Sequence, residues 1–201
     1  MFHDTFVKKL VMKKTVLFSI GVLSVLFVSC RQNDNILSKY IRPLISGQEF
    51  LNGEKKWCLW LENFNPSEVS KSKELVNRIN NVKELRSKST REATKKLALF
   101  PYLFGEIRQP KTDYIFIPLT SSENRKIIPM GFIDKNTIST NGNLIIPNGD
   151  LFLFGQLTSL MHMAWVKYTC GRLKSDYRYS KDLVYNNYPF PKNVSEKQKK
   201  A

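Results

Sequence analysis

The stretch from Leu151 to Ser180, LFLFGQLTSLMHMAWVKYTCGRLKSDYRYS, constrains the fold of this chain more than any other. Apolar residues recur in it at three- and four-residue spacing, which predicts that its first two thirds form one long core helix. We expect Asn148 or Asp150 to cap the start of this helix and Gly171 to end it in a left-handed turn. The expected inward face consists of Leu151, Phe154, Leu157 or Thr158, Met161, Ala164 or Trp165, and Tyr168.

Polar residues crowd the turn that follows this helix. From Arg172 to Ser180 the chain is rich in basic, aromatic and hydroxyl side chains, and a core helix can hold such a turn rigidly against a polyanion. The net charge is +15, of which residues 1–34 carry +3, so the rest of the chain carries +12. This balance favours a nucleic acid or an anionic membrane surface as the partner, although many soluble proteins are basic without either.

Two more helices are predicted upstream of that stretch. Asn65 and Pro66 form a helix-start signal, and the helix that follows to about Arg86 would turn Leu75, Ile79, Val82 and Leu85 inward. Arg86 and the neighbouring cations would face solvent or phosphate. A capping-box pattern at Ser89–Glu92 predicts a shorter helix that ends near Phe100.

Several short β-prone runs complete the fold prediction. The run around Trp57–Leu61 is apolar on both faces, which predicts a buried strand. Further predicted strands are Tyr114–Ile117, Lys126–Ile128, Met130–Ile133 and Leu144–Ile146. The expected class is α+β, with a small mixed or antiparallel sheet packed against the long C-terminal core helix and one or two further helices, preceded by a signal-like apolar segment.

No catalytic or metal-binding pattern is visible in the sequence. Of the three cysteines, Cys58 and Cys170 lie in apolar runs and are expected to be buried free thiols. No paired Cys/His spacing indicates zinc, and we expect no metal site. His162 lies on the predicted core helix, where a packed side chain is expected rather than a base or ligand.

Residues 1–34 differ in character from the rest. Lysines precede an apolar run from Val16 to Val28, and Ser29-Cys30 follows it. This pattern is similar to a bacterial lipoprotein signal with Cys30 as the lipidated residue, and the run is shorter than the roughly 20 apolar residues of a membrane-spanning helix. The alternative is a gene fusion or a mis-called start that precedes a cytosolic domain.

Three ordered blocks carry a resemblance to a known family. Tyr40–Pro43, Gln48–Gly53 and Lys56–Leu61 form the first block, and Ile115–Pro118, Ser121–Arg125 and Ile128–Phe132 form the second. The third consists of Thr158–Lys167, Cys170–Ser180 and Leu183–Pro191. Together, across roughly residues 35–191, they resemble the target-recognition and C-terminal region of the MmeI-like DNA methyltransferases, which are restriction–modification enzymes.

The resemblance implies a part of an enzyme. Residues 35–147 would be the target-recognition domain, 148–191 the core helix with the C-terminal family segment, and 192–201 a basic tail that looks cut short. The glycine-rich loop for S-adenosylmethionine and the Asn-Pro-Pro-Tyr motif for a flipped adenine are not found in this sequence. Asn187–Phe190 is only superficially similar to that motif and is interpreted as a structural segment. We therefore expect no catalytic residue, no cofactor in this chain and no activity from it alone.

The implied function is sequence-specific binding of duplex DNA in the cytoplasm. Methyl transfer from S-adenosylmethionine to adenine would belong to the missing catalytic domain or to a separate methyltransferase chain. The alternatives are a membrane-anchored lipoprotein, if the N-terminal segment is used, and a non-functional gene remnant. The DNA-binding candidates, each of which could instead be a surface charge or a local ion pair, are Arg42, Lys55, Lys56, Lys88, Arg91, Arg108, Lys111, Ser121, Ser122, Asn124, Arg125, Arg172, Lys174, Tyr177 and Arg178. Asp176 is expected to orient Arg172 or Arg178, and Met161 and Met163 to fill the core.

Overall fold

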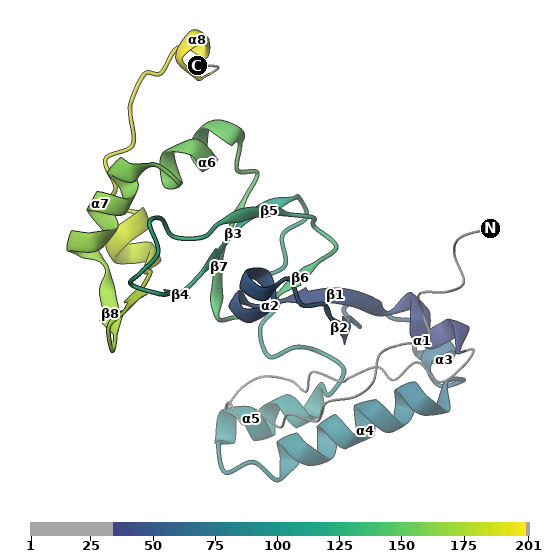
Figure 1. The fold of residues 1–201 in the computed structure, drawn as a ribbon. Helices are drawn as coiled ribbons and strands as arrows, with labels where there is room; N and C mark the ends of the chain where they lie inside the picture. The colour runs from purple at the N-terminus through teal and green to yellow at the C-terminus, as the bar shows by residue number, and fades with distance from the viewer. Residues whose placement is uncertain (1–33, 200–201) are drawn as a thin grey trace.

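The computed structural model describes residues 34–199 (Figure 1). The signal-like segment and its lipidation candidate Cys30 lie outside this range. None of the helices within residues 34–199 is both long and apolar enough to span a membrane. The described chain mixes helices with three small sheets, which confirms the α+β class but replaces the single predicted sheet with three.

The first sheet is mixed and contains two elements that sequence reasoning missed. Its central strand β1 (Ile41–Ile45) pairs antiparallel with β2 (Lys56–Leu59) and parallel with the short β6 (Ile138–Ser139). Helix α2 (Gly47–Asn52) connects β1 to β2, and Ser46 and Glu49 form a reciprocal capping box at its start. Cys58 on β2 is buried as expected, whereas Trp57 is partly exposed.

The second sheet forms the centre of the molecule. Strand β3 (Tyr114–Pro118) lies between β5 (Gly131–Ile133) and β7 (Asn143–Pro147), each antiparallel to it. It is buried along its whole length because the main core packs on Ile115 and Ile117 and the Phe50 ring packs on Phe116. These three strands confirm the predicted runs to within two residues. The predicted strand Lys126–Ile128 is wrong, because this segment is a loop whose Ile128 nevertheless points into the core.

The third sheet joins segments that are distant in sequence. Strand β4 (Thr120–Ser121) pairs antiparallel with β9 (Asp176–Arg178), which pairs antiparallel with β8 (Gly171–Leu173). The polar turn predicted after the core helix is therefore a β-hairpin.

The predicted long core helix consists of two helices, α6 (Leu151–Leu157) and α7 (Leu160–Thr169). Asp150 caps α6 as predicted, and its carboxylate accepts a hydrogen bond of 2.7 Å from the Leu153 amide. Ser159 interrupts the helix because it takes an extended conformation and its hydroxyl caps α7. The expected left-handed turn at Gly171 is also wrong, since the chain leaves α7 in an extended conformation and enters β8.

The break between α6 and α7 shifts the helical phase, so the predicted inward face is wrong for α7 except at Trp165, which is partly buried against the main core. Met161 and Tyr168 are 67% and 92% exposed, and Leu151 at the start of α6 is exposed as well. The buried face of α7 instead carries His162, Met163 and Val166. Met163 therefore fills the core as predicted, and Met161 does not.

The predicted helix from Pro66 to Arg86 is likewise divided. Helix α3 (Pro66–Val69) starts at the predicted cap Asn65, and α4 (Lys73–Ser87) starts at a new cap, Ser72. Leu75 and Val82 are buried as predicted, but the predicted inward Leu85 is 67% exposed. Short helices complete this region and the two ends of the described chain: α1 (Asn35–Lys39), α5 (Glu92–Lys96), the 3₁₀ turn η1 (Leu97–Leu99), the π-helical turn η2 (Lys181–Tyr185) and α8 (Glu196–Lys199).

Arg86 is buried, in contrast to the expected solvent-facing position. Its guanidinium donates hydrogen bonds of 2.9, 2.9 and 2.7 Å to the carbonyl oxygens of Leu97, Phe100 and Leu103. This side chain thereby fastens η1 and the loop after it onto α4. The predicted capping box before α5 does not form, because Arg91 occupies the cap position without a side-chain hydrogen bond.

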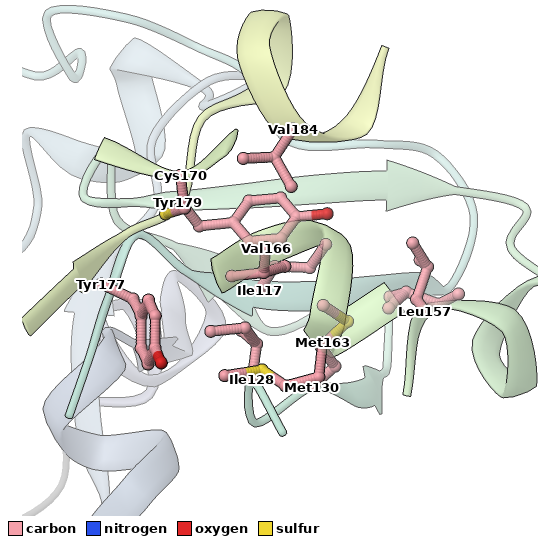
Figure 2. Packing of buried hydrophobic residues seen from close by; sticks show 11 residues of the cluster. Ile117, Ile128, Met130, Leu157, Met163, Val166, Cys170, Tyr177, Tyr179 and Val184 are labelled. Carbon is pink, nitrogen blue, oxygen red and sulfur yellow. The ribbon is translucent and has the colours of Figure 1, made fainter. Parts of the chain in front are cut away.

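The main core lies between the central sheet, α7 and the third sheet. Val166 and Met163 of α7 pack with Ile117 of β3 and with Tyr177 and Tyr179 of the β9 segment (Figure 2). A smaller cluster around Leu75 holds α4 against the β2 end of the first sheet. Helices α6 and α7 thus lie at one end of the molecule and α4 and α5 at the other, with the sheets between them (Figure 1).

Candidate nucleic-acid interface

The third sheet brings together two of the predicted polar clusters. Thr120 and Ser121 of β4 pair with Arg178 and Tyr177 of β9. The loop after β4 is held to the hairpin, because the Glu123 amide donates a 3.3 Å hydrogen bond to a carboxylate oxygen of Asp176. Loop 122–126 therefore lies against the β8–β9 hairpin, although the two segments are far apart in the sequence.

Arg172 is held by contacts within the hairpin. Its guanidinium carbon lies 3.9 Å from the ring centroid of Tyr177, its cross-strand partner, and one guanidinium nitrogen donates a 3.0 Å hydrogen bond to the Ser175 carbonyl. A cation stacked on an aromatic ring loses little further freedom when it binds an anion. Lys174 at the tip has φ = 56°, in the left-handed region that closes the turn.

The two faces of this sheet have different characters. Because side chains alternate along a strand, Ser121 and Tyr177 point inward and are buried, whereas their neighbours Thr120 and Arg178 point outward and are exposed. Arg178 lies opposite Gly171 on its other side, so no side chain covers it there. Within residues 34–199, no carboxylate lies within 4.0 Å of a side-chain nitrogen of Arg178, and the same holds for Lys174 and Arg125.

Asp176 has a different role from the predicted one. It was expected to orient Arg172 or Arg178, but its carboxylate instead accepts from the Glu123 amide and so shapes loop 122–126. In that loop the Ser122 hydroxyl accepts a 3.3 Å hydrogen bond from the Asn124 amide, which leaves the exposed Asn124 side chain available to a partner.

Three other predicted cations are occupied by ion pairs. Lys56 pairs with the buried carboxylate of Glu49, Lys88 pairs with Glu84 one helical turn away, and Arg108 pairs with Glu106. A further one, Arg42, donates to the carbonyls of Lys39 and Ile41 at 3.1 Å each. The remaining predicted cations outside the third sheet, Lys55, Arg91 and Lys111, are exposed on three separate segments.

Two residues of this surface were missed by sequence reasoning. Lys126 was assigned to a strand, and Thr120 was not considered. Lys126 could have been found, because it directly follows the predicted Arg125 in a polar run. Thr120 could not have been found, because its importance comes only from its pairing with distant Arg178.

The buried titratable groups behave as packing groups. His162 lies 3.0 Å from the Tyr179 hydroxyl through Nε2, and burial lowers the pKa of His162 to about 4. Burial raises the pKa of Cys58 to about 12 and also raises the pKa of Cys170, so both remain protonated, unreactive thiols, as predicted. In the described part of the chain no group of three or more His, Cys, Asp or Glu residues could hold a metal ion.

Asn187–Phe190 is a structural segment, as predicted. The Asn187 amide donates a 2.6 Å hydrogen bond to the Asp182 carbonyl, and Tyr188 is buried with its ring 4.5 Å from the His162 ring, edge to face. Phe190, at the position of the motif's aromatic residue, packs edge to face on Tyr185 and Tyr188 at ring distances of 5.4 and 4.8 Å and lies against the main core, so its ring is already engaged within this chain.

Comparisons with known proteins agree with the family resemblance. A family model described as "MmeI, target recognition domain" matches residues 27–192. DNA methyltransferase A of Bacillus subtilis (strain 168) is 41% identical over 155 residues, which are 77% of this chain and 18% of that protein. The structure of the Type IIL restriction-modification enzyme MmeI in complex with DNA matches with a TM-score of 0.79 and 45% identity, over 83% of this chain and 22% of that one. The chain thus spans about a fifth of the length of these relatives.

Proposed function

The chain belongs to the MmeI target recognition domain family, and we propose that it reads a base sequence in duplex DNA for a restriction–modification methyltransferase. One observation carries this proposal. The pairing of β4 with β9 merges two polar clusters into a single exposed surface, whose cations have no carboxylate partner among the described residues. We call this the hairpin surface; it consists of Thr120, loop 122–126, Lys174 and Arg178, while Arg172 lies on the opposite face of the hairpin, over Tyr177.

The geometry of the hairpin surface suits a DNA groove. A two-stranded β-ribbon fits into the major groove, where an arginine can bind guanine O6 and N7 with two hydrogen bonds. Arg178 has an exposed threonine hydroxyl on one side and a glycine on the other, so a base edge can approach it closely. Arg172, which is already oriented by Tyr177, suits a phosphate contact.

The other predicted residues have lesser parts in this proposal. Exposed Lys55, Arg91 and Lys111 remain proposed phosphate contacts outside the hairpin surface, and so does Arg42, which the carbonyl oxygens of Lys39 and Ile41 hold in place. Lys56, Lys88 and Arg108 would have to exchange an ion pair for a phosphate. Buried Ser121 and Tyr177 support the surface from below.

We further propose that the methyl donor is S-adenosylmethionine and the target base adenine, with the chemistry supplied by a catalytic part outside residues 34–199. The relative that is itself called a DNA methyltransferase supports this division of labour. Since such a system acts on the DNA of the cell, we place the domain in the cytoplasm.

The proposal can be tested with the full chain and a pool of randomised duplex DNA. The retained DNA is sequenced after selection at two salt concentrations. We expect a short enriched motif, and an affinity that falls steeply with salt. Arg178→Ala should relax the motif at one position and weaken binding to it by about 1–3 kcal/mol.

Two further variants separate base reading from general attraction. Lys174→Ala should weaken binding to all sequences alike and lower the salt slope by about 0.9. Lys95→Ala is the matched control, because this lysine is exposed, is paired with Glu92 on the far helix α5 and is not one of the predicted DNA contacts. The proposal fails if no motif is enriched, or if Arg178→Ala behaves like the Lys95→Ala control.

A further inference from the structure

Helix α7 carries an apolar stripe that faces solvent. Leu160, Met161, Ala164 and Tyr168 follow one another at helical spacing on one side of α7, and all four are exposed. Leu160 is 77%, Met161 67% and Tyr168 92% exposed. We call these four residues the docking stripe. An exposed apolar patch of about 300–600 Å² is often the functional contact surface of a protein.

The helix beneath the stripe is rigid. Its opposite face buries His162, Met163 and Val166 in the main core, the last of them completely. Trp165 donates a 3.0 Å hydrogen bond from its indole nitrogen to the Val184 carbonyl, which fastens η2 along α7. The stripe is therefore a preformed surface. A partner can bind it without the entropic cost of ordering a flexible segment.

The chemistry of the stripe excludes DNA as the covering partner. Affinity for a nucleic acid comes mainly from cations on phosphates. Within α7 itself, Lys167 is the one Lys, Arg, Asp or Glu beside the stripe, whereas the candidate cations lie on the hairpin surface and elsewhere. An apolar stripe with one lysine at its rim matches a protein surface of apolar side chains with a carboxylate at its edge.

The size of the stripe favours a partner domain over a second copy. Its three large side chains expose on the order of 400 Å² of apolar area, at about 100–200 Å² each. A stable complex of free proteins needs about 800 Å² per partner, whereas contacts between domains of one assembly start at about 600 Å² in total. In the relatives this domain makes up only about a fifth of a longer chain, so there it sits beside further protein.

We propose that the docking stripe packs against the catalytic part of the methyltransferase, so that α7 sets the position of the hairpin surface relative to the site of methyl transfer. The proposal rests on the proposed function for the identity of the partner. It assigns α7 a contact with protein and the hairpin surface the contact with DNA.

The oxidation rates of two methionines on α7 measure directly whether the docking stripe is covered. Met161 is 67% exposed and Met163 is 3% exposed, so dilute hydrogen peroxide should oxidise the first and spare the second in the free chain. The probe is DNA methyltransferase A of Bacillus subtilis with its matching 155 residues exchanged for those of this chain. In that exchanged enzyme we expect the oxidation of Met161 to slow at least tenfold, while Met163 serves as the internal folding control.

Variants test whether Leu160 and Tyr168 form the contact that protects Met161. Leu160→Ser with Tyr168→Ser should restore Met161 oxidation in the exchanged enzyme and leave DNA binding by the free chain unchanged. Leu85→Ser is the matched control, because Leu85 is also 67% exposed but lies on α4. It should change neither the oxidation of Met161 in the exchanged enzyme nor DNA binding by the free chain.

The proposal is overturned if Met161 is oxidised equally fast in the free chain and in the exchanged enzyme, or if protection survives the double substitution. Protection that grows with the concentration of the free chain would also overturn it, in favour of a second copy as the partner. DNA selection with the free chain tests the proposed function independently, so the failure of one proposal is distinguishable from the failure of the other.

Discussion

Acidification should destabilise this fold through one buried imidazole. His162 is 1% exposed, its Nε2 lies 3.0 Å from the Tyr179 hydroxyl, and its Nδ1 has no hydrogen-bond partner among the described residues. The groups that face the ring are the tyrosines Tyr179 and Tyr188, neither of which is charged. A proton on this ring would therefore be buried without a compensating anion, which is why burial lowers the pKa of His162 from 6.5 to about 4.

The sign and the size of the effect follow from proton linkage. Between pH 6.5 and pH 4 the unfolded chain binds a proton at this residue and the folded chain does not, so stability is complete above pH 6.5 and falls as the pH decreases. The loss amounts to about 2 kcal/mol at pH 5 and about 3 kcal/mol at pH 4, at 1.36 kcal/mol for each pKa unit. That is a large share of the 5–15 kcal/mol that typically separates folded from unfolded domains.

The assay is urea unfolding followed by tryptophan fluorescence at pH 7.5, 6.5, 5.5 and 5.0. His162→Gln is the comparison, because its amide can still reach the Tyr179 hydroxyl but does not titrate. Acidic residues that lose their charge at low pH affect both proteins alike. The free energy of unfolding should therefore fall by about 2 kcal/mol more in the wild type than in the variant between pH 7.5 and pH 5. Parallel pH dependences for the two proteins would refute this reasoning.

Three substitutions test packing and capping elsewhere in the fold. Arg86→Met leaves three buried carbonyls without their donor and should lower the free energy of unfolding by about 3 kcal/mol in urea titrations; an unchanged midpoint would mean that water replaces the guanidinium. Gly149→Ala places a Cβ 2.3 Å from a methyl carbon of Ile115 and should cost about 1–3 kcal/mol in a thermal melt, whereas Gly142→Ala, where the Cβ meets open space, should cost nothing comparable. Glu49→Ala removes the capping box of α2 and leaves a lysine without its partner, so about 1–2 kcal/mol should be lost, and hydrogen exchange should rise in α2 first.

Features set by neighbouring residues were predictable from the sequence. Asn65 and Asp150 are caps because a short polar side chain accepts hydrogen bonds from the backbone amides of the helix turn that follows it. This interaction involves only residues adjacent in the sequence, so it could be predicted. Strand β3 was predictable because four adjacent β-prone apolar residues admit few other structures. The packed role of His162 followed in the same way from the apolar character of its helix.

Features set by distant residues were not predictable. Ser159 had the chemistry of a cap, but only the tertiary packing of α7 decides that it ends α6 rather than staying within a longer helix. Arg86 looked like a solvent-facing cation because the three carbonyls that bury it belong to a later loop. The predicted DNA contacts included residues of loop 122–126 and of the β8–β9 hairpin. Nothing in the sequence indicated that the two-residue strand β4 would join these two segments.

The connection between α7 and β8 gives the two proposed surfaces a common mechanical basis. The chain passes from Thr169, the last residue of α7, through the single buried Cys170 into β8, so no flexible linker separates the docking stripe from the hairpin. Val166 on the helix and Tyr177 on β9 belong to the same core cluster, which opposes any sliding of the hairpin against the helix. A domain that reads bases for a catalytic site located elsewhere needs such rigidity, because an error of about 1 Å in placing the reacting groups can reduce a rate about 100-fold. On this view one side of α7 is buried in the main core and holds the hairpin in place. The other side is apolar because it contacts the catalytic part, which lies outside the described residues, so this chain alone does not explain its exposed apolar face.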